Sequence, residues 1–275
     1  MNFRLAKQII YGIGYLLVLF LIVFVVYLLW FKPAPTCFDN NQNQAETGVD
    51  CGGPCTACEI INLSPLQLSQ VKFFPADNQT VIMAEIKNPN FNYGADSFDY
   101  TITIYPVRNE ISNGVYGTST AKIQTITGSS FIYSGETKYI LEPVEVDSKN
   151  ISNVKISFSN PNWKSAKDFP KPEIQLRETN IEPAATRGLI INGSMANTNA
   201  FSLSKIRIIA FLFNSFGVQI SASKTEMENV SAFQEKSFQI NFPKNISLMS
   251  TSTTPQANSA KADSSKTKFY TEAIR

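Results

Sequence analysis

Residues 81–112 read VIMAEIKNPNFNYGADSFDYTITIYPVRNEIS, and residues 189–221 read LIINGSMANTNAFSLSKIRIIAFLFNSFGVQIS. The two stretches align at an offset of about 109 residues, which places Asn88 against Asn197. In both, short runs rich in β-branched and aromatic residues alternate apolar with polar positions, a pattern that predicts strands. Because the same pattern occurs twice, the chain is expected to hold two copies of one β unit.

Turn signals separate the expected strands, among them Asn-Gly, Ser-Gly and Phe-Gly pairs. Asn88 and Asn197 are expected to cap strand ends through bonds from side chain to backbone. A repeat of about 100 residues has the length of one immunoglobulin-like sandwich. We therefore predict a mainly β fold, in which a single N-terminal transmembrane helix precedes two immunoglobulin-like antiparallel β-sandwich domains.

The expected boundaries follow from composition. The first β-sandwich is placed at residues 61–168 and the second at residues 185–243, with the proline-bearing segment 169–184 as their linker. Residues 32–60 form a cysteine-rich linker module. Residues 244–275 are polar and of low complexity, which predicts a disordered tail.

Both β units resemble known families. In the second unit, the relevant stretches are residues 190–194 (IINGS), 206–217 (IRIIAFLFNSFG) and 233–238 (FQEKSF). They resemble the FxLYD family of small extracytoplasmic β-sandwiches, with Phe213 standing for the family's Tyr and Asn214 for its Asp. The first unit, with NPN at 88–90 and GADSFDYTITIY at 94–105, is distantly similar to the LEA14-type sandwich associated with water stress. These resemblances imply the fold rather than an activity.

An uncharged apolar segment lies near the N-terminus. Residues 9–31 read IIYGIGYLLVLFLIVFVVYLLWF and, as a helix, would extend about 34 Å, enough to cross a hydrocarbon core of about 30 Å. Tyr11 near one end and Trp30 near the other suit the headgroup zones. We predict a transmembrane helix in contact with the lipid bilayer. A buried core helix is the alternative, but the rest of the chain offers it no helical partners.

The flanking charges predict the orientation of this helix. Arg4, Lys7 and the terminal amine precede it, whereas Lys32 alone follows immediately. The positive-inside rule then places residues 1–8 in the cytoplasm and the C-terminal part outside, as in a single-pass protein of the cell membrane. A cleaved signal peptide is the competing interpretation, although the segment is long for one and no clean cleavage site follows it.

Four cysteines are clustered after the apolar segment, at Cys37, Cys51, Cys55 and Cys58. In an oxidising compartment they would form two disulfides that staple a segment too short to bury a core. In a reducing compartment they could instead hold one zinc ion. The predicted orientation favours disulfides, whose connectivity cannot be read from the sequence.

Oxygen-bearing side chains lie between the first two cysteines. Asp39, Asn41, Asn43 and Asp50 have the 1, 3, 5 and 12 spacing of an EF-hand-like calcium loop, with Glu46 as a further carboxylate. Position 6 is glutamine rather than glycine, and position 12 is aspartate rather than glutamate, so the pattern is incomplete. The alternative is a disulfide-tied turn without metal, because Asp and Asn also populate turns.

The same segment resembles a short module that recurs in other proteins. The residues that carry the resemblance are Cys37, Asp39, Asn43, Glu46, Thr47, Gly48, Asp50, Cys51, Gly52, Gly53, Cys55 and Cys58. They are similar to the pattern C-x-D-(x)-N-x-x-E-T-G-x-D-C-G-G-x-C-x-x-C, found beside membrane anchors and β domains in bacterial surface proteins. The resemblance implies an exported bacterial protein and no particular activity.

Composition narrows the function. The chain has no histidine, which removes the commonest general acid–base group and every Ser–His or Cys–His nucleophile. Its formal net charge of +2 gives no sign of the basic stripe that nucleic-acid binding needs. We therefore expect neither an enzyme nor a nucleic-acid-binding protein.

The leading hypothesis is a non-enzymatic protein of the cell envelope, anchored in the membrane, that uses tandem sandwiches to bind a protein or polymer partner. The alternative is an accessory subunit of a membrane machine for secretion, pilus assembly or transport. A remote alternative is a glycosidase with paired carboxylates, drawn from Asp96, Asp99, Glu142 and Glu145.

Overall fold

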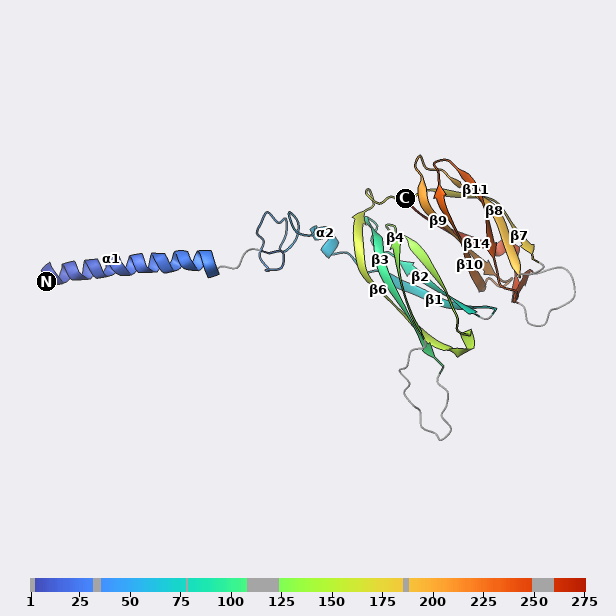
Figure 1. Cartoon of the computed structure of the whole chain (residues 1–275), viewed down its shortest axis with the longest axis horizontal. Coiled ribbons are helices and arrows are strands. Elements are labelled where there is room, and N and C mark those ends of the chain that lie inside the picture. Colours follow the sequence, from blue (N-terminus) through green and yellow to red (C-terminus); the bar gives the residue numbers. More distant parts are fainter. Residues whose placement is uncertain (1–2, 32–35, 78, 108–123, 185–187, 249–259) are drawn as a thin grey trace, which may run out of the picture. The chain divides into compact units, whose positions relative to one another are not determined.

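The computed structural model describes the chain apart from residues 1–2, 32–35, 78, 108–123, 185–187 and 249–259 (Figure 1). The chain divides into two compact units, residues 1–63 and residues 64–275. The first unit holds the apolar helix and the cysteines, and the second is built from strands. The prediction of a mainly β fold behind one N-terminal helix is therefore confirmed.

The first unit begins with a long helix. Helix α1, Phe3–Val26, continues as a π-helical turn at Tyr27–Phe31. In the described part of the chain, Lys7–Leu29 is the one helical stretch long and apolar enough to cross a membrane, and none of it is buried by protein. Apolar side chains with no protein around them are stable in lipid rather than in water. This helix is compatible with a single-pass anchor or a signal sequence. A short helix, α2 at Cys58–Ile61, ends the cysteine segment.

The first half of the second unit is a sandwich-like pair of antiparallel sheets, with strand orders β1-β2-β5 and β4-β3-β6 (Figure 1). The strands are β1 Gln67–Ala76, β2 Gln79–Lys87, β3 Tyr93–Pro106, β4 Gln124–Ile132, β5 Thr137–Val144 and β6 Ile151–Ser165. A 3-10 turn, Ser148–Asn150, precedes β6. Alternate residues such as Ile82, Ile86, Ile102 and Ile104 are buried in one core, as strand periodicity requires.

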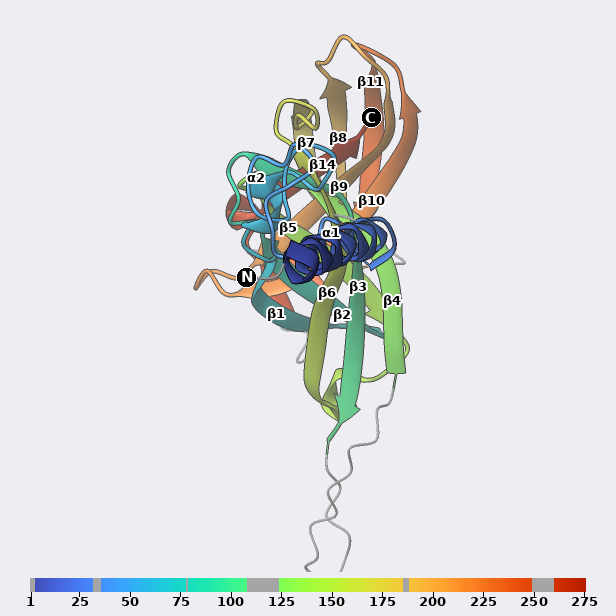
Figure 2. The same ribbon diagram turned by 90° about the vertical axis from the view of Figure 1, so that its left-hand side faces the viewer.

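The second half is another such pair of sheets, with orders β11-β8-β7 and β10-β9-β14 (Figure 2). Its strands are β7 Ile174–Pro183, β8 Leu189–Asn197, β9 Leu203–Phe213, β10 Gln219–Val230, β11 Glu235–Asn241 and β14 Lys268–Ile274. Two short strands, β12 Ile246–Leu248 and β13 Ala260–Ala262, pair in parallel, and a 3-10 turn at Ser264–Lys266 leads into β14. Residues such as Ile191, Ile208 and Ile240 form the core between the sheets.

Strand β9 explains how the two halves of this unit pack. Its residues Ile206 and Ile208 face the core of the second sandwich. Ile209 and Phe211, which alternate with core residues further along the strand, belong to a third cluster that includes Leu141 from β5 of the first sandwich. A strand covered on both faces is expected to be apolar throughout, which accounts for the unbroken run IIAFLF.

The structure corrects two predicted boundaries. The segment 169–184 is not simply a linker, because Ile174–Pro183 forms strand β7 of the second sandwich. Its prolines suggested a linker, yet Ile174, Leu176 and Ile181 pack against the second core. The prolines lie outside this strand or at its last residue, where a missing N–H does not interrupt the ladder.

The prediction of a disordered tail at 244–275 is likewise wrong for the residues that the structure describes there. Lys268–Ile274 forms strand β14, which pairs with β9 along its whole length. Phe269 and Ala273 pack into the second core. The polar composition of residues 244–275 as a whole obscured a seven-residue strand near the end of the sequence.

Candidate functional site

The cysteine module carries the site residues that the sequence singles out. Its four cysteines form two disulfides, Cys37–Cys55 and Cys51–Cys58, so the prediction of disulfides is confirmed. All cysteines are thereby paired. The two links interleave along the sequence, and neither joins neighbouring cysteines. The zinc alternative requires thiolates, which oxidised sulfur atoms do not provide.

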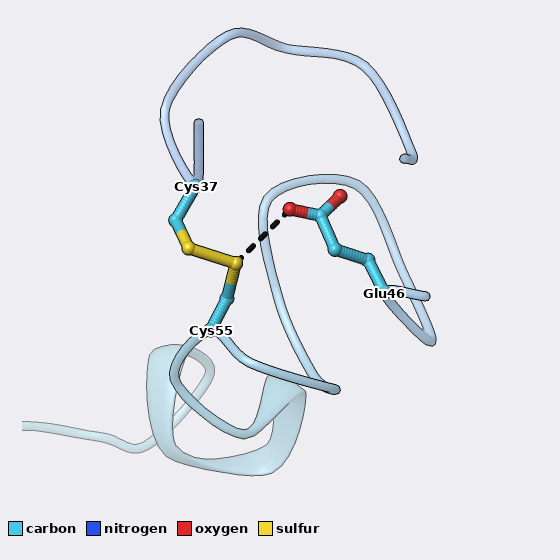
Figure 3. Close-up of side chains that lie close together, drawn as sticks. All are labelled: Cys37, Glu46 and Cys55. Carbon is cyan, nitrogen blue, oxygen red and sulfur yellow. Dashed lines mark hydrogen bonds between the residues drawn. A yellow bond between two sulfur atoms is a disulfide. The ribbon is translucent and has the colours of Figure 1, made fainter. Parts of the chain in front are cut away.

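Glu46 is the buried carboxylate of this module, with 7% of its surface exposed. Its Oε2 accepts hydrogen bonds from the backbone N–H groups of Asn43 at 3.1 Å and Asp50 at 3.2 Å. Its Oε1 lies 3.1 Å from Cys55 Sγ (Figure 3). Because that sulfur is bonded to Cys37, it has no proton to donate, and the approach is a contact rather than a hydrogen bond. Glu46 therefore closes the loop through its two backbone hydrogen bonds, while its other oxygen lies against the first disulfide.

The two predicted calcium-binding aspartates accept hydrogen bonds from the loop itself. The Asp50 carboxylate accepts from the backbone N–H of Asp39 at 2.9 Å and of Asn40 at 3.0 Å. The Asp39 carboxylate accepts from the backbone N–H of Asn41 and from the side-chain amide of Asn43, both at 2.9 Å. These bonds give each aspartate a role in closing the turn that requires no ion.

Other features of the loop bear on the calcium prediction. Gln44, at the position that an EF-hand gives to glycine, adopts a left-handed φ of 50°. Asn43 Oδ1 is buried and has no hydrogen-bond partner among the described residues. Among the His, Cys, Asp and Glu side chains that the structure describes, the one group of three whose ligand atoms all lie within 4.8 Å of one another is Glu46 with the sulfurs of Cys37 and Cys55, and these sulfurs are disulfide-bonded. Calcium binding at this loop stays a prediction.

A second set of charged residues lies where the two sandwiches meet, and the sequence patterns did not single it out as a site. Lys138 on β5 is fully buried and pairs with Glu272 on β14, which is 3% exposed. Glu272 also accepts a hydrogen bond from Arg207, its cross-strand neighbour on β9. Arg207 Nε in turn donates to Glu226 at 2.7 Å. The network joins three strands of the second sandwich to one strand of the first.

Glu136 forms a neighbouring set of bonds at the end of the first sandwich that leads into β5. Its Oε1 accepts from Lys171 Nζ at 2.6 Å and from Tyr270 Oη at 3.0 Å, and its Oε2 accepts from the backbone N–H of Tyr133 at 2.9 Å. Burial, with the charge of Glu136 next, raises the pKa of Tyr133, and the same two causes raise that of Tyr270. Both phenols therefore stay neutral and act as hydrogen-bond donors here.

The pKa values of the two cations, Lys138 and Arg207, shift in opposite directions. Burial lowers the pKa of Lys138, an effect that the charge of Glu272 opposes. Burial also works against the charge on Arg207, but Glu272 and Glu226 outweigh it and raise the pKa of that guanidinium. The one signal available from sequence was Lys138 itself, which sits two residues from Ile140 on the inward side of an apolar strand.

The carboxylates considered for a glycosidase have structural partners or are exposed. Asp99 accepts from the Asn160 side chain at 2.9 Å, and Glu142 accepts from Tyr100 Oη at 2.8 Å. Glu145 is exposed. Asp96 lines a cavity of about 420 Å³ together with Asp168 and aromatic side chains that include Phe169 and Phe201. The structure does not bring these four carboxylates together as one site.

Comparisons with known proteins add little. No family model matches the chain, and a search of curated proteins finds no match. Among solved structures, the chain is similar to the crystal structure of red sea bream transglutaminase at 11% identity, with a TM-score of 0.23. The likeness covers 78% of this chain and spans about a third of the other, 32%. At that TM-score it supports no statement about function.

Proposed function

We propose that this chain is a membrane-anchored, extracytoplasmic protein of the cell envelope that binds a protein or polymer partner through its β-sandwiches. The observation that carries the proposal is a fully disulfide-bonded module that directly follows an apolar helix in the sequence. Disulfides persist in oxidising compartments, and such a helix is stable in lipid. Together they favour an anchor with the strands outside the cytoplasm.

A test of sidedness addresses this observation directly. Intact cells would be treated with a membrane-impermeant maleimide, with and without prior reduction by an impermeant phosphine. We expect labelling of Cys37, Cys51, Cys55 and Cys58 only after reduction. Labelling that requires cell lysis would place the module in the cytoplasm and contradict the proposal. Recovery of a chain that lacks residues 1–31 would identify the helix as a cleaved signal instead.

Binding of a partner is supported by an exposed aromatic side chain at a tight turn. Phe216, between β9 and β10, is 88% exposed, and its neighbour Val218 is 59% exposed. The Asn214 side chain accepts from the backbone N–H of Phe216 at 3.0 Å and of Val218 at 2.9 Å. A turn held in this way presents its apolar residues without a large entropy cost on binding, as interface anchors do.

The binding proposal is tested by crosslinking in whole membranes. A photo-reactive amino acid placed at Phe216 is expected to yield a reproducible adduct, and placement at the exposed Glu145 serves as the matched control. A partner found equally at both positions, or at neither, would contradict a role for this turn. A second variant, in which an unrelated transmembrane helix replaces residues 9–31, distinguishes the two hypotheses. An accessory subunit of a membrane machine should lose its partner, whereas a protein whose helix is only an anchor should keep it.

A further inference from the structure

The contact between Lys138 and Glu272 brings an amine and a carboxyl group together in a dry site. The two residues lie 134 positions apart, on β5 and β14, and are 0% and 3% exposed. The ring of Phe131 lies 3.9 Å from Lys138 Nζ. In the described part of the chain, this is the one ion pair in which both side chains are under a tenth exposed. Water has almost no access to either group.

Burial changes the chemical state that such a pair prefers. Removing both charges from water costs free energy that their attraction repays only in part. Burial accordingly lowers the pKa of Lys138. Transfer of one proton along the hydrogen bond gives a neutral amine beside a neutral carboxylic acid. A neutral amine has a free lone pair and is a nucleophile, whereas an ammonium group is not.

We propose that Lys138 and Glu272 condense to an intramolecular amide bond that joins strand β5 of the first sandwich covalently to strand β14 of the second. Nζ of Lys138 attacks Cδ of Glu272, so an N–C bond forms. The bond from Cδ to Oε2 then breaks, and Oε2 leaves as water with two of the three ammonium protons. No oxidant, reductant or further reactant is needed.

Arg207 is placed to assist this step. It donates from Nη1 to Oε1 of Glu272, the oxygen that does not leave. Attack by the amine turns that oxygen into an oxyanion in the tetrahedral intermediate. The Arg207 side chain is 23% exposed, and a guanidinium held in place there stabilises such a charge without the reorganisation that solvent requires. Arg207 touches the reacting group and therefore has a catalytic role in the proposed condensation.

Glu136 acts as a positioning residue. It precedes Lys138 by two residues, and it accepts a hydrogen bond at 3.0 Å from Tyr270, which precedes Glu272 by two residues. Tyr133 adds a second tie, because its Oη donates to the backbone carbonyl of Ala273 at 2.5 Å. These bonds hold the segment before β5 against β14 and keep the amine of Lys138 beside the carboxyl group of Glu272.

The consequence of the bond is mechanical and separate from any binding function. β14 is the edge strand of its sheet and is held by pairing with β9. If only these hydrogen bonds held it, β14 could peel away from β9. A covalent link to β5 would close the chain between the two residues, so that a pulling force could not separate the sandwiches at this strand.

The test is the intact mass of the full-length chain after reduction and alkylation of its cysteines. We expect a mass lower than that of the sequence by one water molecule, and a proteolytic digest should contain a branched peptide that joins Lys138 to Glu272. The closed chain should also migrate faster than an open one in a denaturing gel under reducing conditions. Recovery of the unmodified mass, with the two peptides separate, would overturn the proposal.

A control variant tests whether the loss of one water molecule occurs at Lys138. Lys138→Arg keeps the buried positive charge but has no amine that can form this amide. It should therefore show the full sequence mass, and the faster migration in the denaturing gel should disappear. Its fold is checked by the circular dichroism of its strands and by the completeness of its two disulfides. Loss of water that persists in Lys138→Arg would show that dehydration occurs elsewhere, as in succinimide formation at an aspartate, and would also overturn the proposal.

Discussion

Asn88 and Asn197 make the same set of hydrogen bonds, one in each sandwich. Both are almost fully buried, at 0% and 1% exposure. Each side-chain oxygen accepts from the residue two positions later: Asn90 provides its backbone N–H and its side-chain amide, and Asn199 does the same in the second copy. The predicted capping role of both asparagines is confirmed, and the sequence alignment that paired them has a structural cause.

The hydrogen bonds that the two asparagine side chains donate also match. Each Nδ2 donates to backbone carbonyls of the two loops that meet at this end of its sandwich. The acceptors are Tyr93 and Tyr133 for Asn88, at 2.7 and 2.9 Å, and Phe201 and Ser231 for Asn197, at 2.9 and 2.8 Å. Each asparagine side chain thus joins three segments of its sandwich through hydrogen bonds.

The first prediction follows from this shared role. Asn88→Ala and Asn197→Ala should each lower the free energy of unfolding by about 2 to 4 kcal/mol, because every buried polar partner left without a bond costs about 1 to 3 kcal/mol. Urea unfolding of the full-length chain in detergent measures the loss. Asn150→Ala, at an exposed position with no side-chain bond among those described, is the control and should change little. Similar losses for all three variants would contradict the capping role.

The fold could be predicted because its signals are local. Alternating strands such as residues 98–105, and the repeat itself, are visible without any knowledge of packing. Strand β7 was missed because four of its ten residues form an exposed polar run, RETN, which hides the alternation. The contact of Lys138 with Glu272 could not be predicted, since it joins positions 134 apart and depends on how two sandwiches pack.

The second prediction concerns the turn that closes the cysteine module. Gly52 has a φ of +76°, and a Cβ atom there would lie 1.9 Å from Thr47 Oγ1. Gly52→Ala should therefore hinder formation of the neighbouring Cys51–Cys58 disulfide and leave free thiols in protein purified without reductant. Thiol titration under denaturing conditions measures them. Gly12→Ala, at a helical position with no atom within 4 Å of the added Cβ, should leave none.

The third prediction is the pH dependence of the loop around Asp39. The hydrogen bond from the Asn43 side chain, with further bonds from the backbone, holds the pKa of Asp39 below its ordinary value of 3.8. The ionised carboxylate is thus the form that the folded loop favours. Its contribution is present above the unfolded pKa and is lost as the pH falls through the lower folded value.

The Asn43 side-chain amide resonance should therefore shift in NMR spectra with a midpoint below pH 3.8, and Asp39→Asn should remove this transition. A midpoint at or above the ordinary value would show that the hydrogen bond does not form in solution.

The last prediction asks how much of the loss in stability comes from leaving a buried charge without its partner. Glu272→Ala removes the partner of a fully buried lysine, and breaking a buried pair in this way costs about 3–5 kcal/mol. Adding Lys138→Met should recover part of that loss, because a methionine of similar length is apolar and suits the neighbouring Phe131 ring. Both variants lack the amine–carboxyl pair, so their comparison holds whether or not the wild-type chain carries an amide bond.

The exposed pair of Arg177 and Glu235, at 50% and 48% exposure, provides the control for that comparison. Its two charges remain in contact with water, so Glu235→Ala should cost less than about 1 kcal/mol, and adding Arg177→Met should recover nothing. Urea unfolding of all four variants decides the matter. If the Lys138→Met, Glu272→Ala double variant is less stable than Glu272→Ala alone, burial of an unpaired charge is not what destabilises this junction, and Lys138 must stabilise it through contacts of its own.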